Sequence, residues 1–132
     1  MRHLWLALLL SGCLLPTLFT APPQTFYDAP PEYQAWWDAT CECAGITGSM
    51  TRIRWGRMPD DRAGAFLCSK MGPRIVKWPG YCYGAWVEPH LILLSETHVT
   101  NEVTVRHEML HDLLRVIEHT DARFYTCVGI PR

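Results

Sequence analysis

Between residues 31 and 45 the large side chains recur at the spacing of a helix. In PEYQAWWDATCECAG these residues are three or four positions apart, so they would share one face of an α-helix. They are Tyr33, Trp36, Trp37 and Thr40. Pro31 suits a first helical turn and Gly45 suits a stop. The pattern predicts a short helix whose aromatic face belongs to the hydrophobic core.

A series of short apolar segments follows, separated by Gly and Pro. The first, MTRIRWGRMP, alternates Ile53 and Trp55 with Arg52 and Arg54, which is typical of a strand with one buried face. The others are GAFLCS, RIVKW, YCYGAWV and HLILLS. Several short strands at this spacing predict a small antiparallel sheet.

One longer helix is predicted after the sheet. Thr100 or Asn101 can cap its N-terminus. Its predicted buried face carries Val103, Leu110, Leu114 and Ile117. We expect this helix to continue to about Ile117, with the chain turning between Glu118 and Asp121. The order of helix, small antiparallel sheet and helix predicts an α+β domain.

The N-terminus has the features of an export signal. MRH is a short basic start, LWLALLL is an apolar run, and LSGC matches the lipoprotein signal in which the cysteine is lipidated. We predict a signal peptide over 1–12, a lipidated Cys13 with a Pro-rich tether over 13–31, and a folded domain over 32–132. A signal cut near Ala21 and an uncleaved anchor from Leu4 to Ala21 are the alternatives. All three place the domain outside the cytoplasm, as a membrane-anchored lipoprotein or as a secreted or periplasmic protein.

Length and charge limit the classes of function. The 132 residues suffice for one domain. The chain has 12 Lys and Arg against 13 Asp and Glu, a formal net charge of −1. No charge field therefore favours nucleic acid as a partner.

Five cysteines follow Cys13, and an exported domain can join them in disulfides. Cys68 and Cys82 flank a segment punctuated by Gly and Pro, and we expect them to pair. Cys127 is expected to pair with Cys43, which leaves Cys41 free, because cysteines in C-x-C seldom bond each other. Metal binding by the C-x-C thiols is the alternative.

The segment VRHEMLHDLL contains the pattern H-E-x-x-H. His107 and His111 are four residues apart on the predicted helix, so both imidazoles can reach one zinc ion about 2 Å away. Glu108 projects beside the metal, where a carboxylate can take a proton from a zinc-activated water and pass it to a leaving amine. A pair of histidines without metal is the structural alternative.

A catalytic zinc normally has three protein ligands and one open position. His119 is the preferred third ligand, because the chain can turn back beyond the end of the helix. The alternatives are Asp121, Glu118, His98 and His90. Asp112 points away from the predicted ion and is expected to support the site by accepting a histidine N–H.

HEMLH on its helix resembles the zincin-type metallopeptidases. More closely, the chain resembles small uncharacterised bacterial lipoproteins with a minimal zincin-like domain, over most of residues 33 to 130. The segments that carry this resemblance are CAGITG, ILLSE, VRHEMLHDLL, His119 and the F-x-x-C ending. The resemblance implies His107, His111 and His119 as zinc ligands and Glu108 as catalytic base. The absence of glycine between His111 and His119 departs from the pattern of zincins with a close third ligand.

Zincins also hold the substrate backbone on an edge strand above the active helix. HLILLSE is the candidate strand, because it comes directly before the helix; an ordinary buried strand is the alternative. Tyr125, His98 and Tyr83 are the candidates for stabilising an oxyanion.

Two functions follow from these patterns. The favoured one is a zinc-dependent peptide-bond hydrolase of the cell envelope, with a peptide or protein substrate and a membrane anchor through the N-terminal lipid. The alternative is a non-catalytic envelope lipoprotein with a structural zinc or no metal.

Overall fold

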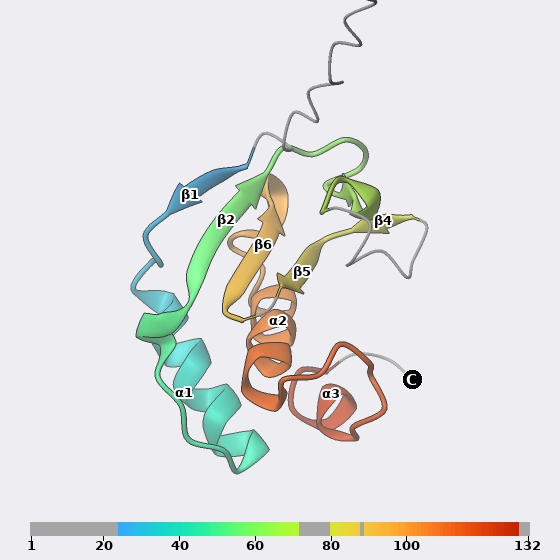
Figure 1. The fold of residues 1–132 in the computed structure, drawn as a ribbon. Helices are drawn as coiled ribbons and strands as arrows, with labels where there is room; N and C mark the ends of the chain where they lie inside the picture. Colours follow the sequence, from blue (N-terminus) through green and yellow to red (C-terminus); the bar gives the residue numbers. More distant parts are fainter. Residues whose placement is uncertain (1–23, 72–79, 88, 130–132) are drawn as a thin grey trace, which may run out of the picture.

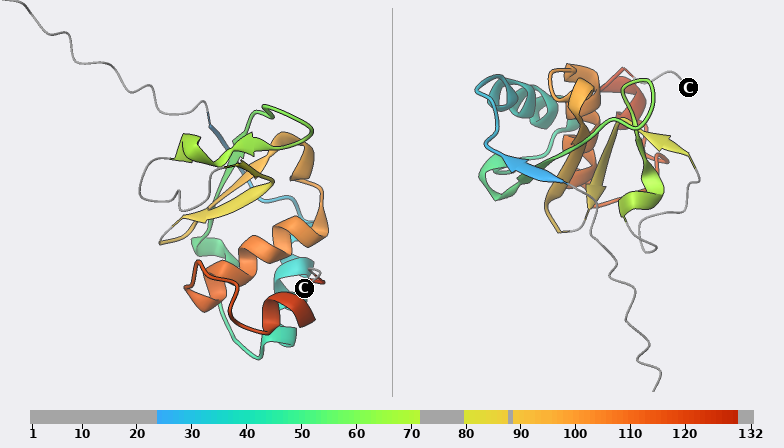
Figure 2. Two further views of the ribbon diagram at one scale, coloured as in Figure 1. Left: turned by 90° about the vertical axis from the view of Figure 1, so that its right-hand side faces the viewer. Right: turned by 90° about the horizontal axis from the view of Figure 1, so that it is seen from above.

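The computed structural model describes residues 24–71, 80–87 and 89–129. Within these ranges the chain forms three α-helices, a four-stranded sheet and a two-stranded sheet. Figures 1 and 2 show how they are arranged. The predicted α+β class is confirmed. None of the helices in the described ranges is long and apolar enough to span a membrane.

Helix α1 (Glu32–Ala44) lies where the aromatic spacing predicts it. Tyr33, Trp37 and Thr40 are buried. Gly45 ends the helix in the left-handed conformation at φ 68°, and its N–H donates to carbonyls of the last turn. Glycine is favoured at such a position because it has no Cβ to clash.

The four-stranded sheet is mixed, and the prediction of an antiparallel sheet is wrong. Its order is β1 (Thr25–Tyr27), β2 (Arg54–Met58), β6 (Leu91–Ser95) and β5 (Gly84–Val87). Strands β2 and β6 run parallel, while β1 and β5 are antiparallel to their neighbours. The prediction assumed that successive apolar runs pair in order. Instead, β3 (Phe66–Leu67) and β4 (Tyr81–Cys82) pair with each other in the second sheet, so β5 and β6 return as a hairpin beside β2.

The sheet also corrects the predicted start of the folded domain and the predicted place of HLILLSE. Strand β1 belongs to the sheet, so the folded domain begins before residue 32, inside the segment predicted to be a tether. HLILLSE forms the internal strand β6, hydrogen-bonded on both sides, so it is not an edge strand. The segment RIVKW lies outside the described residues.

Helix α2 (Glu102–Leu114) is capped by Asn101, whose side chain accepts the Thr104 N–H at 3.0 Å. It packs on the sheet with Val105, Met109 and Leu113. The predicted face was wrong in part, because Val103 and Ile117 are exposed. Figure 2 shows α1 and α2 on the same side of the sheet. The main core, which includes Trp37, Trp55, Trp86 and Ile92, lies between these helices and the sheet.

Two disulfides join the cysteines that the sequence paired. Cys43–Cys127 links the last turn of α1 to the residue after α3 (Arg123–Thr126), and Cys68–Cys82 links the segments around β3 and β4. Among the described cysteines, Cys41 is free. The C-terminal segment that carries α3 is therefore tied to α1 beside helix α2.

Candidate metal centre

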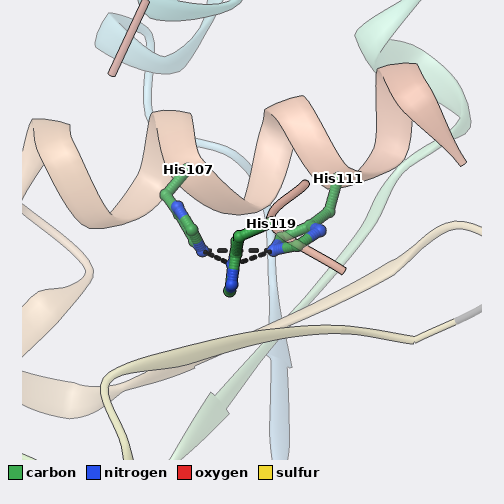
Figure 3. A group of neighbouring side chains, drawn as sticks. All are labelled: His107, His111 and His119. Carbon is green, nitrogen blue, oxygen red and sulfur yellow. Dashed lines mark hydrogen bonds between the residues drawn. The ribbon is translucent and has the colours of Figure 1, made fainter. Parts of the chain in front are cut away.

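Three histidine side chains converge at one point beside α2. His107 and His111 project from successive turns of the helix, and His119 reaches them from the loop that follows it (Figure 3). Their Nε2 atoms are 2.9 Å apart for His107 and His119, 3.0 Å for His111 and His119, and 3.1 Å for His107 and His111. Nitrogen ligands at tetrahedral positions around one zinc ion lie about 3.3 Å apart. The spacing of the three Nε2 atoms therefore fits a single ion.

The hydrogen bond of His111 prepares its ring for a metal. Its Nδ1 lies 2.7 Å from the carbonyl oxygen of Val116. A carbonyl can only accept, so Nδ1 carries the proton and Nε2 has a free lone pair. The Val116 carbonyl thus orients the ring, as the outer partners of metal-bound histidines do.

Burial favours the neutral form of His107 and His111, and partial desolvation acts in the same direction on the more exposed His119. Burial lowers the pKa of His107 to about 3, and repulsion from the protonated forms of His111 and His119 acts in the same direction. Burial also lowers the pKa of His111 to about 4 and lowers that of His119. Phe124 of α3, itself fully buried, packs against all three rings at centroid distances of 4.5 to 5.3 Å. Neutral imidazole is the form that binds zinc.

The turn that delivers His119 begins earlier than predicted. Helix α2 ends at Leu114, not at about Ile117, because Arg115 adopts the left-handed conformation at φ 57°. The Arg115 N–H donates to the carbonyl of His111 at 2.8 Å. The helix can therefore end without the glycine that zincins often have here. Val116, the residue after Arg115, directs its carbonyl at His111.

Glu108 lies on the side of α2 that faces strand β5. Its side chain is buried, and burial raises its pKa to about 8 while the backbone N–H of Trp86 opposes the rise. A Cβ on Gly84 would lie 2.9 Å from both Cγ and Oε1 of Glu108. Only glycine leaves room for the strand to come this close to the carboxyl.

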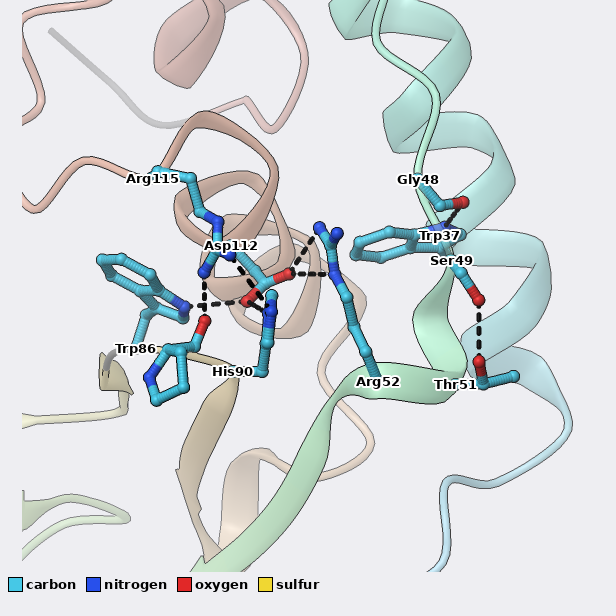
Figure 4. A network of polar contacts seen from close by, with 10 residues as sticks. Trp37, Gly48, Ser49, Thr51, Arg52, Trp86, His90, Asp112 and Arg115 are labelled. Atoms are coloured by element: carbon cyan, nitrogen blue, oxygen red, sulfur yellow. Dashed lines mark hydrogen bonds and ion pairs between the residues drawn. The ribbon is translucent and has the colours of Figure 1, made fainter.

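Asp112 accepts a histidine N–H, as predicted, but the histidine is His90, which is not one of the three converging histidines. Its fully buried carboxylate accepts hydrogen bonds from Arg52 (3.1 Å), the indole of Trp86 (2.9 Å) and Nδ1 of His90 (2.8 Å), as Figure 4 shows. It points to the sheet because it lies on the face of α2 that packs there.

The other candidate ligands have different surroundings. His98 contacts Ser95 Oγ at 3.0 Å and stacks on Tyr83, and Asp121 forms an ion pair with Arg123 at 2.6 Å. The Tyr125 hydroxyl donates to the carbonyl of His119. Within the described residues, the group that could hold a metal ion consists of His107, His111 and His119. Glu118 is not part of it. Cys13 lies outside the described residues.

Sequence reasoning missed four residues around the site. Gly84 in a strand pattern is a recognised sign of close backbone approach, so it could have been found. Trp86 and Val116 gave no signal that distinguished them from ordinary core and loop residues, because their roles depend on contacts between distant segments. Phe124 appeared only as the start of the F-x-x-C ending, and its contact with the histidines was not predicted.

Comparison of the chain with protein-family models, curated proteins and solved structures found no match.

Proposed function

We propose that this protein is a zinc-dependent peptide-bond hydrolase. The observation that carries the proposal is the convergence of three imidazoles, with Nε2 atoms 2.9 to 3.1 Å apart, on the helix that carries a buried glutamate. His107, His111 and His119 would hold the ion. When bound, zinc supplies a Lewis acid that polarises a peptide carbonyl and lowers the pKa of water.

Glu108 is the proposed acid–base group. Its carboxylate would accept a proton from the attacking water and return it to the amine nitrogen as the peptide C–N bond breaks. In the metal-free protein its pKa of about 8 lies near neutral pH, which suits a group that must both accept and release a proton. The Trp86 N–H orients the carboxyl.

Strand β5, in place of β6, is the proposed docking strand for the substrate backbone. It ends the order of the four-stranded sheet. The Ser95 N–H donates to the Tyr83 carbonyl at 2.9 Å, so the next pair, Gly84–Leu94, is not hydrogen-bonded, and neither is Trp86–Ile92. The peptide groups of Gly84 and Trp86 therefore face away from β6. The Trp86 N–H is taken up by Glu108, which leaves the N–H and carbonyl of Gly84 and the carbonyl of Trp86 for an extended peptide.

The number of ligands favours catalysis over a structural zinc. Structural zinc sites usually have four protein ligands, whereas catalytic sites have three and an open position. Three histidines form the cluster in the described part of the chain. The proposal includes export of the domain and attachment to the membrane through a lipid on Cys13.

Cleavage of a peptide library by the zinc-loaded protein tests the proposed function. We expect Glu108→Gln to keep zinc and lose at least about a hundredfold in kcat/KM, because the proton acceptor is removed. Glu102→Gln, an exposed glutamate on the same helix, is the control and should cleave like wild type. Unchanged cleavage by Glu108→Gln would show that another group is the base.

A further inference from the structure

Asp112 connects helix α2 to the edge strand next to the site. The hydrogen bond from the Trp86 indole to its Oδ1, at 2.9 Å, is buried and joins residues of α2 and β5. Trp86 also donates its backbone N–H to Glu108. Glu108 and Asp112 are one helical turn apart, so two carboxylates of α2 hold the two N–H groups of one residue of β5.

The Asp112 carboxylate is also linked to the turn that carries His119. Arg115 donates to Nε2 of His90 at 3.1 Å, which leaves the proton of His90 on Nδ1, directed at Asp112. Arg115 also donates to the carbonyl of Pro89. The network in Figure 4 therefore runs from the end of α2 through His90 and Asp112 to strand β5.

Stability alone does not require a carboxylate at this position. A buried charge loses its hydration, and replacing a buried ion pair by packed apolar residues is often neutral or stabilising. Hydrogen bonds to a carboxylate are directional, however, and they determine where the partner groups lie. The three donors on Asp112 come from the segment before β2, from β5 and from the loop after β5.

We propose that Asp112 is a positioning residue that sets the place of strand β5 and, through Trp86, the orientation of the Glu108 carboxyl. The role in catalysis rests on the proposed function. Asp112 touches neither substrate nor metal in this scheme. It keeps the Trp86 N–H at Glu108 and keeps the free edge of β5 beside the three histidines.

Trp86→Phe tests the link, because it removes the indole N–H and leaves the backbone N–H and an aromatic ring. Trp37→Phe is the matched control. Trp37 is a buried tryptophan of the same core, and its indole donates to the carbonyl of Gly48 at 3.2 Å, away from β5. The readouts are hydrogen exchange of the backbone amide at position 86, zinc content, and kcat and KM for peptides cleaved by wild type.

We expect the amide at position 86 to exchange about tenfold faster in Trp86→Phe than in Trp37→Phe, the change that loss of one buried hydrogen bond predicts. Zinc content should equal that of wild type in both. In Trp86→Phe we expect kcat to fall about tenfold relative to Trp37→Phe, because the base is less well oriented. Asp112→Asn, which keeps an acceptor oxygen for the indole, should retain more activity than Asp112→Ala.

Equal exchange at position 86 in the two tryptophan variants would overturn the link between Asp112 and β5. Faster exchange with unchanged kcat would overturn the positioning role. A zinc-loaded wild type that cleaves no peptide would overturn the proposed function and the catalytic part of this inference, while the exchange comparison would still decide whether Asp112 sets β5.

Discussion

Arg115 has the backbone conformation on which the position of His119 depends. Its φ of 57° is costly for a residue with a Cβ, yet it ends α2 and brings the Val116 carbonyl to His111. Its guanidinium bonds to Pro89 and His90 offset part of this cost. A strained residue next to a cluster of chemical groups is common at functional sites.

Replacing Arg115 separates the backbone strain from the side-chain bonds. Arg115→Ala and Arg115→Gly both lose the guanidinium, but only glycine adopts this conformation without strain. We expect Arg115→Gly to be more stable than Arg115→Ala by about 1 kcal/mol. Urea unfolding of the two variants measures the difference; an alanine variant of equal or greater stability would contradict the argument.

The raised pKa of Glu108 makes the metal-free protein sensitive to pH. The pKa is about 8 when folded and 4.5 in the reference state, so between these values the unfolded chain loses a proton that the folded chain keeps. This contribution to stability is fully present below pH 4.5 and is lost as pH rises through 8. Glu108→Gln should therefore gain stability relative to wild type from pH 4.5 to pH 8, by a few kcal/mol. Urea unfolding of the two metal-free proteins at several pH values measures the difference in their unfolding free energies. A difference that stays constant from pH 4.5 to pH 8 would contradict the prediction.

At the scale of elements, α3 closes the site from the side of the C-terminus. Phe124 of α3 packs against the three imidazoles. Cys127, the residue directly after α3, forms the disulfide with Cys43. Arg123 adds a hydrogen bond from α3 to the carbonyl of Ala44. A four-residue helix has little stability of its own, so these ties hold it in place.

Removing the long disulfide should loosen α3 and weaken metal binding. The bond spans 84 positions of the sequence, and we expect the double variant Cys43→Ala/Cys127→Ala to lose about 4 kcal/mol of unfolding free energy. Its zinc affinity should fall because Phe124 and His119 become mobile. Cys41→Ser, which changes the free cysteine beside it, is the control. Urea unfolding and competition with a zinc chelator measure the two effects, and equal zinc affinity in the double variant would exclude the role of α3.

The close approach of β5 to α2 depends on Gly84. In Gly84→Ala the new Cβ would overlap Cγ and Oε1 of Glu108, so the carboxyl or the strand must move. We expect zinc to be retained and kcat/KM to fall about a hundredfold. Ala85→Ser, one residue along and on the opposite face of the strand, should have a much smaller effect. Similar kinetics for the two variants would show that this contact is not needed.

At the scale of the whole molecule, local features could be predicted and long-range pairing could not. The spacing of Tyr33 and Trp37 predicts α1, a helix of 13 residues, from its own sequence, and Gly45 predicts its end. The H-E-x-x-H spacing likewise places His107 and His111 together, because both depend on one helix. The few cysteines favoured a bond from Cys127 to the Cys41 and Cys43 pair, and the structure joins it to Cys43.

The mixed sheet and the partners of Asp112 depend on contacts between distant segments. Strand β2 pairs in parallel with β6 across more than 30 residues, and nothing in either segment specifies that partner. Asp112 meets Arg52 and Trp86 through the packing of α2 against segments far away in the sequence. Arg115 was missed for another reason, since a left-handed residue without glycine has no local sequence sign.

The zinc content of the purified protein, measured by elemental analysis, tests the central claim most directly. We predict about one zinc per chain in wild type and its loss in His107→Ala, His111→Ala and His119→Ala. His98→Ala, a histidine outside the cluster, should keep the metal. A wild-type protein that binds no zinc, or a His119→Ala variant that binds it with wild-type affinity, would contradict the account.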